Sequence, residues 1–470
     1  MNILSNKFIS HILKNIKFWI IFAFIIRLYG ITNPPLETSH NWRQSDVTMV
    51  ARNFYEKDAN IFLPRIDIAG EKTGITGMEF PLFNYLIYLV SLVFGYDHWY
   101  GRLINLIFSS IGIFYYYKII KKYFCEKLAF YSSFILIFSL WFAFSRKIMP
   151  DTFSFSLSLI GLYYGSNYLE TKKIIHLFYY FIFILTGFLS KIPSAYILIF
   201  FIPLFIDKHI AIKEKIVLTI TTVIALVPVF TWYFYYVPYL VIKYDFWHFF
   251  MGKDISTGIK EILQNMPDAL KRFYENALKF IGFVLFIIGL IYAIKNKNQK
   301  IITVFVLGFI GFGIIILKSG FNFTHHDYYI LPFVPVMALV AAYTLTLIKQ
   351  KQIILIFLIA IMIECIGNYQ HEFRLNTNLD LLSLENDLDK ISKPSDLILI
   401  NSGPYPTPMY FAHRKGWVEN NEKITDTVYI NSLKAKGLKY IVVLKRCFNK
   451  EVVLNYPVIF QNEKYCFYKI

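Results

Sequence analysis

Residues 81–95, PLFNYLIYLVSLVFG, form the stretch on which the fold depends. The stretch is apolar almost throughout, but at about 15 residues it is shorter than the roughly 20 that a membrane-spanning helix needs. Whether it crosses the membrane decides on which side every later loop lies. The topology of the whole chain therefore follows from how this one stretch is interpreted.

The composition around this stretch is that of a membrane protein. Hydrophobic residues make up 56% of the chain and charged residues only 17%, with a mean hydropathy of +0.48. Soluble domains carry about 25% charged residues. A soluble core has no room for this apolar excess, so most of the chain is expected to lie in lipid. Apolar runs suited to spanning helices occupy residues 18–30, 103–119, 128–146, 152–169, 174–190, 193–206, 216–238, 276–294, 301–317, 328–348 and 353–367.

The lysine-rich loops supply the orientation. Short basic loops favour the cytoplasmic side. The five lysine-rich loops of this chain, given at the end of this paragraph, lie on the cytoplasmic side together with the N-terminus only if residues 81–95 do not span the membrane. We therefore predict an interfacial or re-entrant helix there, about eleven spans, and a large first external loop over residues 33–102. The loops concerned are 118–127, 172–173, 208–215, 295–300 and 349–351.

The C-terminal tail differs from the rest of the chain. Residues 368–470 hold 14 Lys/Arg and 11 Asp/Glu, close to the charge content of a soluble domain. Short apolar runs at 397–400, 440–444 and 465–470 predict strands, and 407–413 and 427–436 have helical spacing. The chain thus divides into a membrane domain, 1–367, and a small extracytoplasmic α/β domain, 368–470. Cys447 and Cys466 of the tail form a disulfide or stay as free thiols; the sequence favours neither.

The net charge of +17 comes from 48 Lys/Arg against 31 Asp/Glu. In a membrane protein this excess is explained by cytoplasmic loops, so no nucleic-acid partner is expected. The sequence contains no P-loop, no GxGxxG and no C-x-x-C, which gives no support to an ATP-driven or dinucleotide enzyme. We expect no particular cofactor, and a divalent metal is left open.

The first external loop carries a group of polar residues next to the membrane. It reads HNWRQSD over residues 40–46 and includes Glu79 further on. Asp46 begins an amphipathic helix in this prediction, and an acid in a first turn is often only a favourable partner of the helix dipole. A carboxylate that accepts a hydroxyl proton, near a cation such as Arg43 that holds phosphate, also suits a transfer site.

Further ionisable residues stand at helix ends on the same predicted face. Arg146, Pro150-Asp151 and Lys191 each have a simpler interpretation as snorkelling anchors or helix starts. The HHDYY run that contains His326 and Tyr328 is a weak zinc signal, and hydrogen bonding to phosphate or sugar is the favoured alternative. Ionisable groups are costly near lipid, so a one-sided cluster predicts a functional site.

These segments, in this order over residues 18–345, resemble the polyprenyl-phosphate-sugar-dependent integral-membrane glycosyltransferases. This is the C-type superfamily, which includes protein O-mannosyltransferases and the lipid A aminoarabinose transferase. The resemblance is carried by Ala51-Arg52, EFPLFNYL at 79–86, Phe94-Gly95 with Gly101-Arg102-Leu103, Ser145-Arg146 with Pro150-Asp151, Lys191-Ile192-Pro193, and His326-Asp327-Tyr328-Tyr329 with Pro332 and Pro335.

The resemblance implies that a first-loop acid is the catalytic base and that later basic residues bind the lipid phosphate. Those roles fall on Asp46 and on Arg102, Arg146 and Lys191, and Asp151 matches the second acidic motif. The family has an Asp-Glu pair where this chain has Arg43-Gln44, and Asp46 lies about one helical turn later. Glu37, Glu79 and Asp151 are therefore alternative bases.

The predicted protein is thus a multi-pass enzyme of the cell envelope. It would transfer a hexosyl or pentosyl unit from a polyprenyl-phosphate donor to a hydroxyl of a glycan, lipid or protein, on the outer face and with inversion. The alternatives are a transporter or flippase of lipid-linked sugars and a non-enzymatic envelope scaffold. A transporter predicts ionisable residues deep in its spans and an internal repeat.

Overall fold

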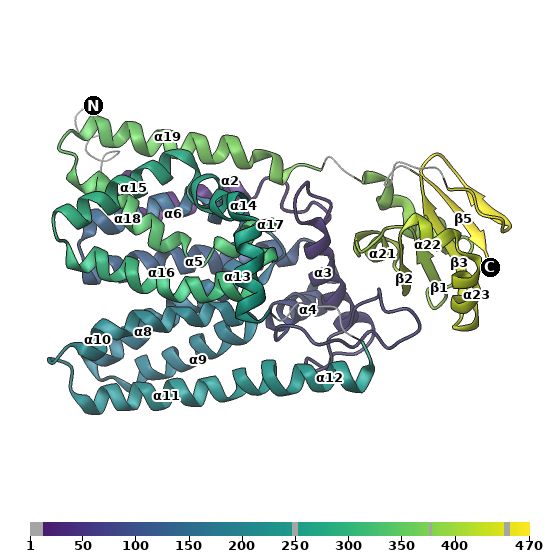
Figure 1. Ribbon diagram of the computed structural model, residues 1–470, viewed down its shortest axis with the longest axis horizontal. Coiled ribbons are helices and arrows are strands. Elements are labelled where there is room, and N and C mark those ends of the chain that lie inside the picture. Colours follow the sequence, from purple (N-terminus) through teal and green to yellow (C-terminus); the bar gives the residue numbers. More distant parts are fainter. Residues whose placement is uncertain (1–12, 247–251, 376–377, 446–451) are drawn as a thin grey trace. The chain divides into compact units, whose positions relative to one another are not determined.

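The computed structural model describes residues 13–246, 252–375, 378–445 and 452–470, which form two compact units (Figure 1). The first unit comprises Met1–Ile31, Arg102–Trp232 and Phe250–His371, and the second comprises Thr32–Gly101, Tyr233–Phe249 and Glu372–Ile470. The first external loop and the C-terminal tail therefore share a unit. Cys447 lies outside the described residues, so its pairing with Cys466 is not addressed.

The first unit is built from helices, most of which lie in the predicted apolar runs. They are α2 (Ile16–Arg27), α5 (Tyr100–Tyr123), α6 (Glu126–Ile137), α7 (Leu140–Phe144), α8 (Pro150–Thr171), α9 (Ile174–Ser190), the 3₁₀ helix η1 (Ile192–Phe201) continued by α10 (Ile202–Ile206), α11 (Ile212–Phe230), α13 (Ile255–Gln264), α14 (Met266–Lys271), η3 (Arg272–Ala277), α15 (Lys279–Lys295), α16 (Gln299–Ser319), α17 (Phe321–His325), η4 (Asp327–Ile330), α18 (Val334–Leu347) and α19 (Lys351–Tyr369). The helices α13 and α14 lie between two runs, and the runs 128–146 and 328–348 are each divided between two elements.

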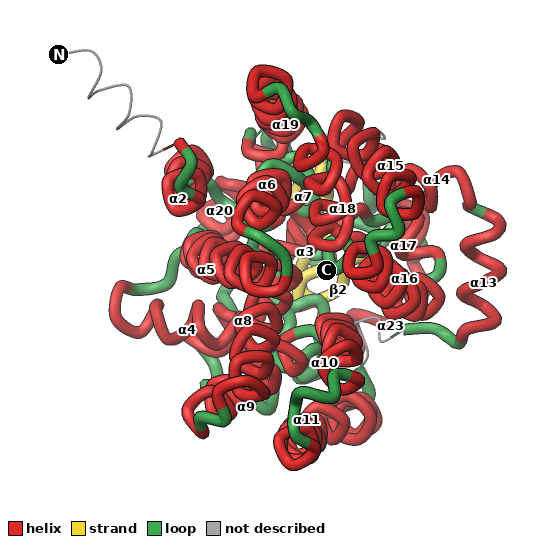
Figure 2. Tube along the Cα trace, turned by 90° about the vertical axis from the view of Figure 1, so that its left-hand side faces the viewer, coloured by secondary structure: helices red, strands yellow, loops and turns green. Residues whose placement is uncertain are grey.

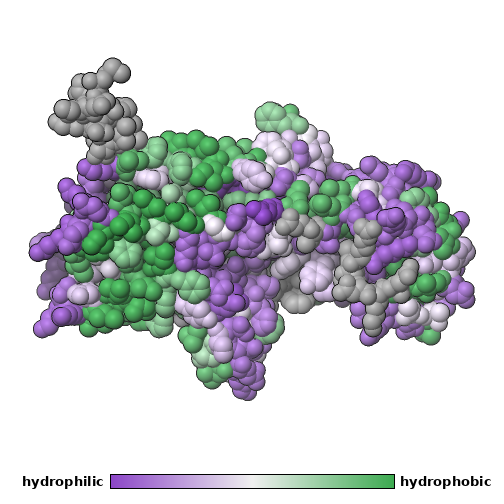
Figure 3. Space-filling model, turned by 90° about the horizontal axis from the view of Figure 1, so that it is seen from above, coloured by the Kyte–Doolittle hydropathy of each residue, from purple (hydrophilic) through white to green (hydrophobic). Residues whose placement is uncertain are grey.

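The surface of this unit is apolar, as lipid requires. Leu355, Ile356, Ile359 and Ile363 of α19 are all exposed. Apolar side chains cover much of the face of the helices that Figure 3 shows. An exposed apolar surface of this extent is costly in water. The apolar surface of the first unit thus confirms the prediction of a multi-pass membrane protein.

Small residues bring the inner helices close together. A side chain at Gly187 of α9 would meet the Ser158 hydroxyl of α8 at 2.5 Å. The Ser154 hydroxyl donates to the Gly187 carbonyl at 2.8 Å. Close packing through Gly and Ser is the usual way in which helices associate in lipid. It fixes α8 and α9 against each other, so that the ends of both helices occupy defined positions.

The number of spans stays a prediction. Within the described residues, four helices are long and apolar enough to cross a membrane, and a bent pair, Met266–Ala277 with Lys279–Lys295, would be a fifth. Other apolar helices are shorter. Among these is α4 (Leu82–Phe94), whose 13 residues extend about 20 Å at 1.5 Å per residue, against a hydrocarbon core of about 30 Å. This length agrees with the predicted interfacial or re-entrant helix.

The second unit contains a mixed five-stranded sheet with the order β2-β1-β3-β5-β4. The strands β1 (Leu397–Ile400), β2 (Gly416–Val418) and β3 (Leu438–Leu444) are parallel, whereas β4 (Val458–Gln461) and β5 (Tyr465–Lys469) pair antiparallel. The three predicted strands are confirmed as β1, β3 and β5. The remaining elements of this unit are α3 (Asn41–Glu56), η2 (Thr231–Tyr236, which begins in the first unit), α12 (Val237–Tyr244), η5 (Gln370–Phe373), η6 (Leu379–Ser383), α20 (Leu384–Asp389), α21 (Thr407–Ala412), α22 (Asn421–Thr425) and α23 (Thr427–Ala435).

Alternation along the strands gives the sheet two apolar faces. Leu399, Ile441 and Val443 share a core with Ile430 and Leu433 of α23. The intervening residues Ile398, Ile400 and Val442 face the opposite way, into a core shared with Met49, Val50 and Phe54 of α3 and with α21. Successive side chains of a strand point to opposite faces. One face of the tail domain is therefore covered by the helix of the first external loop.

Candidate active site

Asp151 and Lys191 form an ion pair in the first unit. The Lys191 ammonium donates to the Asp151 carboxylate, and their side chains are 22% and 8% exposed. Asp151 is the second residue of α8, directly after Pro150, and Lys191 lies in the extended segment between α9 and η1. The other Asp151 oxygen, Oδ2, is buried and has no hydrogen-bond partner among the described residues. The structure thus brings together two predicted site residues that lie 40 positions apart.

The helix ends fix the position of Lys191. Its amide donates to the Gly187 carbonyl at 3.1 Å, and its own carbonyl accepts from the Ser194 amide at 3.0 Å. Its ammonium lies 5.3 Å from the ring centroid of Tyr328, within range of a cation–π contact. Lys191 is therefore a partly buried, positioned cation and not a loose snorkelling anchor.

Tyr328 and His326 stack beside this pair. The two ring centroids are 5.4 Å apart, and the Tyr328 ring lies 6.1 Å from that of Phe144. Tyr328 is 5% exposed in η4. Its ring therefore connects the Lys191 neighbourhood with the 144–149 segment that carries Arg146.

Arg102 and Arg146 converge on the backbone that follows α2. Arg146 donates to the carbonyls of Tyr29 and Gly30, the latter at 3.0 Å, and Arg102 donates to the Ile31 carbonyl at 3.4 Å. Both guanidinium groups are fully buried. Two buried cations next to each other repel each other unless negative groups surround them. The carbonyl oxygens of residues 29–31 supply part of that negative surrounding.

Two residues of this region were missed from the sequence. Asn105, one turn beyond Arg102 on α5, donates to the carbonyls of Phe144, Lys147 and Met149 and so holds the loop that carries Arg146. Arg27, the last residue of α2, is fully buried and donates to the Ser145 hydroxyl. Polar side chains within apolar helices are the signal that identifies such positions.

Asp46 lies in the second unit, on the buried face of α3. It is 1% exposed. The prediction that Asp46 begins the helix is wrong: α3 starts at Asn41 after the left-handed residue His40, with φ of 59°. Asp46 is therefore in the second turn, where interaction with the helix dipole is weak, because that effect decays within the first turn. The simple structural explanation for an acid at this position no longer applies.

The alternative first-loop acids have local partners. Glu79 accepts from the guanidinium of Arg43, and these side chains are 14% and 8% exposed. Glu37 is fully buried and accepts from the amide of Gln44 at 3.5 Å. Arg43 and Asp46 lie three residues apart on α3, a spacing that places them on one helix face.

Arg52, which contributes to the family resemblance, has a structural position. It donates to Asp67 at 3.1 Å and to the Tyr410 carbonyl at 2.9 Å, and its guanidinium stacks 4.4 Å from the Tyr410 ring centroid. Burial raises the pKa of Asp67, but the Arg52 and Lys57 cations outweigh it and keep that pKa below its ordinary value. Arg52 therefore forms a buried ion pair with Asp67 and joins α3 to α21 through its contacts with Tyr410.

The placement of potential metal ligands does not support a metal site. Within the described ranges, no group of three or more His, Cys, Asp or Glu residues is placed to hold a metal ion. Metal dependence stays open, as in the sequence prediction.

Comparison with known proteins identifies the fold. The family model of dolichyl-phosphate-mannose-protein mannosyltransferases matches residues 79–235. Among solved structures, ArnT from Cupriavidus metallidurans bound to undecaprenyl phosphate has 10% identity and a TM-score of 0.55, covering 96% of this chain and 98% of that one. The oligosaccharyltransferase AglB from Archaeoglobus fulgidus, in complex with an inhibitory peptide and a dolichol-phosphate, has 11% identity and a TM-score of 0.57, covering 91% of this chain and 69% of that one.

No curated protein sequence matches the chain significantly. The family model and both structures nevertheless point to the same group of proteins. The recognition made from the sequence is confirmed as far as these matches reach: residues 79–235 match the mannosyltransferase family model, and the chain has the fold of ArnT and AglB. The fold class, a helical membrane part with a small C-terminal sheet domain, is confirmed as well.

Proposed function

We propose that the protein is a glycosyltransferase that moves a sugar from a polyprenyl-phosphate donor to a hydroxyl acceptor at the outer face of the membrane. The observation that carries the proposal is the Asp151–Lys191–Tyr328 group in a fold shared with ArnT, whose structure holds undecaprenyl phosphate. A positioned ammonium and two buried guanidinium groups suit a lipid-linked phosphate as their ligand. The glycan, lipid or protein nature of the acceptor is left open.

The proposed chemistry is an inverting displacement. The Asp46 carboxylate takes the proton of the acceptor hydroxyl, whose oxygen attacks the anomeric carbon. The bond from that carbon to the phosphate oxygen breaks, and its electron pair leaves with the polyprenyl phosphate. Arg102, Arg146 and Lys191 stabilise the charge that develops on this phosphate, an effect worth about 3–4 kcal/mol for a single well-placed donor.

Asp151 is proposed to orient Lys191, because their ion pair holds the ammonium beside Tyr328. His326 and Tyr328 would hydrogen-bond phosphate or sugar. Arg43 is proposed to bind substrate only if its pair with Glu79 opens. Glu79, which is paired with Arg43, stays an alternative base.

The transporter alternative is less well supported. Glu364, which lies in the predicted span 353–367, accepts from the amides of Phe280 and Ile281 at 3.1 Å each. An acid at this place caps the amino end of α15. It is explained by helix capping and not by an ion pathway.

The test is transfer of labelled sugar. Purified protein in lipid vesicles receives a radiolabelled polyprenyl-phosphate sugar and a mixture of envelope glycans, lipids and peptides. Label that leaves the donor for an acceptor supports the proposal. Movement of intact donor across the bilayer without transfer would support the flippase. The absence of both transfer and movement would support the scaffold.

A further inference from the structure

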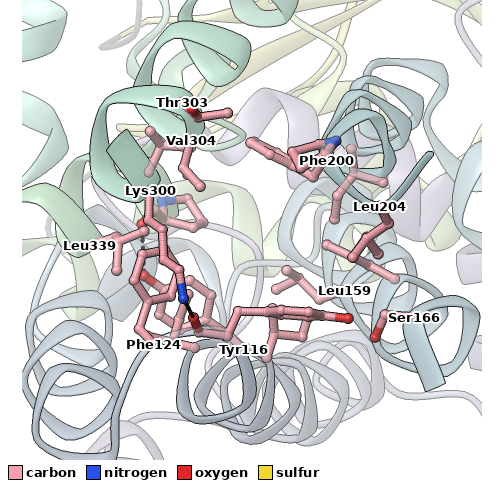
Figure 4. Close-up of a pocket in the computed structure, with 18 of the residues that line it drawn as sticks. Tyr116, Phe124, Leu159, Ser166, Phe200, Leu204, Lys300, Thr303, Val304 and Leu339 are labelled. Carbon is pink, nitrogen blue, oxygen red and sulfur yellow. Dashed lines mark hydrogen bonds between the residues drawn. The ribbon is translucent and has the colours of Figure 1, made fainter. Parts of the chain in front are cut away.

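A cavity of about 470 Å³ lies within the helical unit, away from Lys191. Its walls come from α5, α8, η1, α10, α16 and α18, and Figure 4 shows their side chains surrounding an open centre. Figure 2, seen along the helices, shows α5, α8, α10, α16 and α18 end-on within this unit. The wall is apolar, with Leu159, Phe200, Leu204, Val304 and Leu339 among its residues.

Even the tyrosines of the wall present apolar surface. The Tyr116 hydroxyl donates to the Pro335 carbonyl at 2.8 Å, and the Tyr196 hydroxyl donates to the Pro332 carbonyl. Both hydroxyl groups are thus hydrogen-bonded to the backbone, one to the first turn of α18 and the other to the segment that precedes it. What remains for an occupant is the ring surface, so the cavity favours a hydrocarbon.

The polar residues of the cavity come from the helix termini at one end of the unit. Asp207 follows α10, and Gln299 and Lys300 begin α16. Fifteen residues of η1 and α10 separate Lys191 from Asp207. At about 2.0 Å and 1.5 Å per residue these extend roughly 27 Å, close to the thickness of a hydrocarbon core. The mouth therefore lies at the membrane face opposite Lys191, the face of the lysine-rich loops.

The mouth carries a cation that suits a phosphate. The Lys300 ammonium donates to the Tyr123 carbonyl at 3.2 Å, and within the described residues it makes no ion pair. On the other side, the Asp207 carbonyl accepts from the Lys215 ammonium at 2.6 Å. Lys300 is therefore the cation that lines this opening within the described residues, and Asp207 lines it as well, with its carboxylate accepting from the His209 amide at 2.9 Å.

The distribution of polar residues argues for the occupant. The wall is apolar along the helices and polar only at the helix termini of one end, an arrangement that suits a hydrocarbon chain with a phosphate at that end.

We propose that this cavity binds one acyl chain of a glycerophospholipid from the leaflet on the lysine-rich side, with the lipid phosphate at Lys300. The site is separate from the Asp151–Lys191 group, and the proposal is independent of the proposed function.

The test is lipid retention, measured by native mass spectrometry on full-length protein released from nanodiscs of phosphatidylethanolamine and phosphatidylglycerol. Leu204→Trp and Thr303→Trp are designed to fill the cavity, whereas Phe309→Trp, at a side chain on α16 that is 50% exposed, is the matched control. We expect one bound phospholipid in the wild type and in F309W, with at least about tenfold lower occupancy in both filling variants. Lys300→Ala should lower occupancy about tenfold while the cavity stays open.

Two arms separate the possible occupants, and thermal unfolding is measured for each variant so that only folded protein is compared. Nanodiscs doped with polyprenyl phosphate should leave the bound phospholipid in place. Displacement by that lipid, retention of detergent only, or equal occupancy in folded L204W, T303W and F309W proteins would each overturn the proposal.

Discussion

At the residue scale, the catalytic base is the assignment that most needs a test. Asp46 is buried on α3 outside the first turn, whereas Glu79 is paired with Arg43 and Asp151 with Lys191. Asp46 is the base in the proposed mechanism, and Glu79 and Asp151 are its alternatives.

Asp46→Asn should abolish transfer while donor binding survives. The amide keeps the size of the side chain but cannot accept a proton, so turnover should fall by a factor of about 10²–10⁴. Transfer and donor binding are measured on the same preparation. Asp151→Asn and Glu79→Gln are the matched controls: if D46N keeps near-normal turnover and one of these does not, the base is the other acid.

Lys191 calls for a paired design, because its removal leaves the Asp151 carboxylate without a cation. Lys191→Met alone should lower the free energy of unfolding by about 1–3 kcal/mol, since the carboxylate is mostly buried. The double variant Lys191→Met with Asp151→Asn should recover most of that stability but not transfer activity. Melting temperature and turnover at limiting donor are measured for all three proteins. A double variant with normal turnover would make the pair purely structural.

At the scale of elements, one histidine joins three helices of the second unit. His413, which follows α21, bonds through Nδ1 to Glu385 of α20 at 2.5 Å and through Nε2 to Glu56 of α3 at 2.8 Å. The bonds to Glu385 and then to Glu56 raise the pKa of His413 to about 9 from 6.5. The imidazolium therefore stabilises the contact between the first external loop and the tail.

The sign of the pH dependence follows from this shift. Because the folded pKa is the higher one, the stabilisation is complete below about pH 6.5 and is lost as the pH rises through 9. The His413 and Glu56 side chains are each about a third exposed, so solvent weakens the interaction, and we expect it to contribute about 1–2 kcal/mol to the free energy of unfolding. Amide hydrogen exchange at the end of α3 and in α20 should therefore report easier opening at pH 9.5 than at pH 6.5. His413→Gln should remove most of this difference, and an unchanged difference would place the titrating group elsewhere.

At the scale of the whole molecule, the topology predicts which thiols are accessible. Cys125 is exposed and lies in the 118–127 loop, which the parity of the spans places inside. In intact cells an impermeant thiol reagent should leave Cys125 unlabelled. A cysteine introduced at exposed Ser256 should react, because the same parity places segment 239–275 outside. Cys447 is replaced in the protein used for this experiment. As a control, Cys125 should be labelled in permeabilised cells, in which the reagent reaches the cytoplasmic side. Labelling of Cys125 from outside would mean that residues 81–95 do span.

What the sequence by itself determined is local or compositional. The membrane class followed from hydropathy, and the helices of the first unit followed from apolar runs of fixed length. The strands at β1, β3 and β5 followed from short apolar runs between polar residues. Each depends on side chains close together in the chain, so no knowledge of packing was needed. The strands β2 and β4, with three and four residues, were missed because partly exposed strands of that length carry too little pattern.

Only the tertiary structure decided which polar residues meet. Asp151 pairs with Lys191 because α8 and α9 pack closely through Gly187, whereas Arg52 of α3 pairs with Asp67 of a later loop while it also contacts Tyr410 of α21. Asn105 and His413 acquired roles only from partners far along the chain. Ionic and hydrogen-bond partners are selected by the packing of apolar surfaces, which the spacing of charged residues along the chain does not encode. The sequence therefore named the residues of the candidate site, while the packing of helices and strands decided which of them are neighbours.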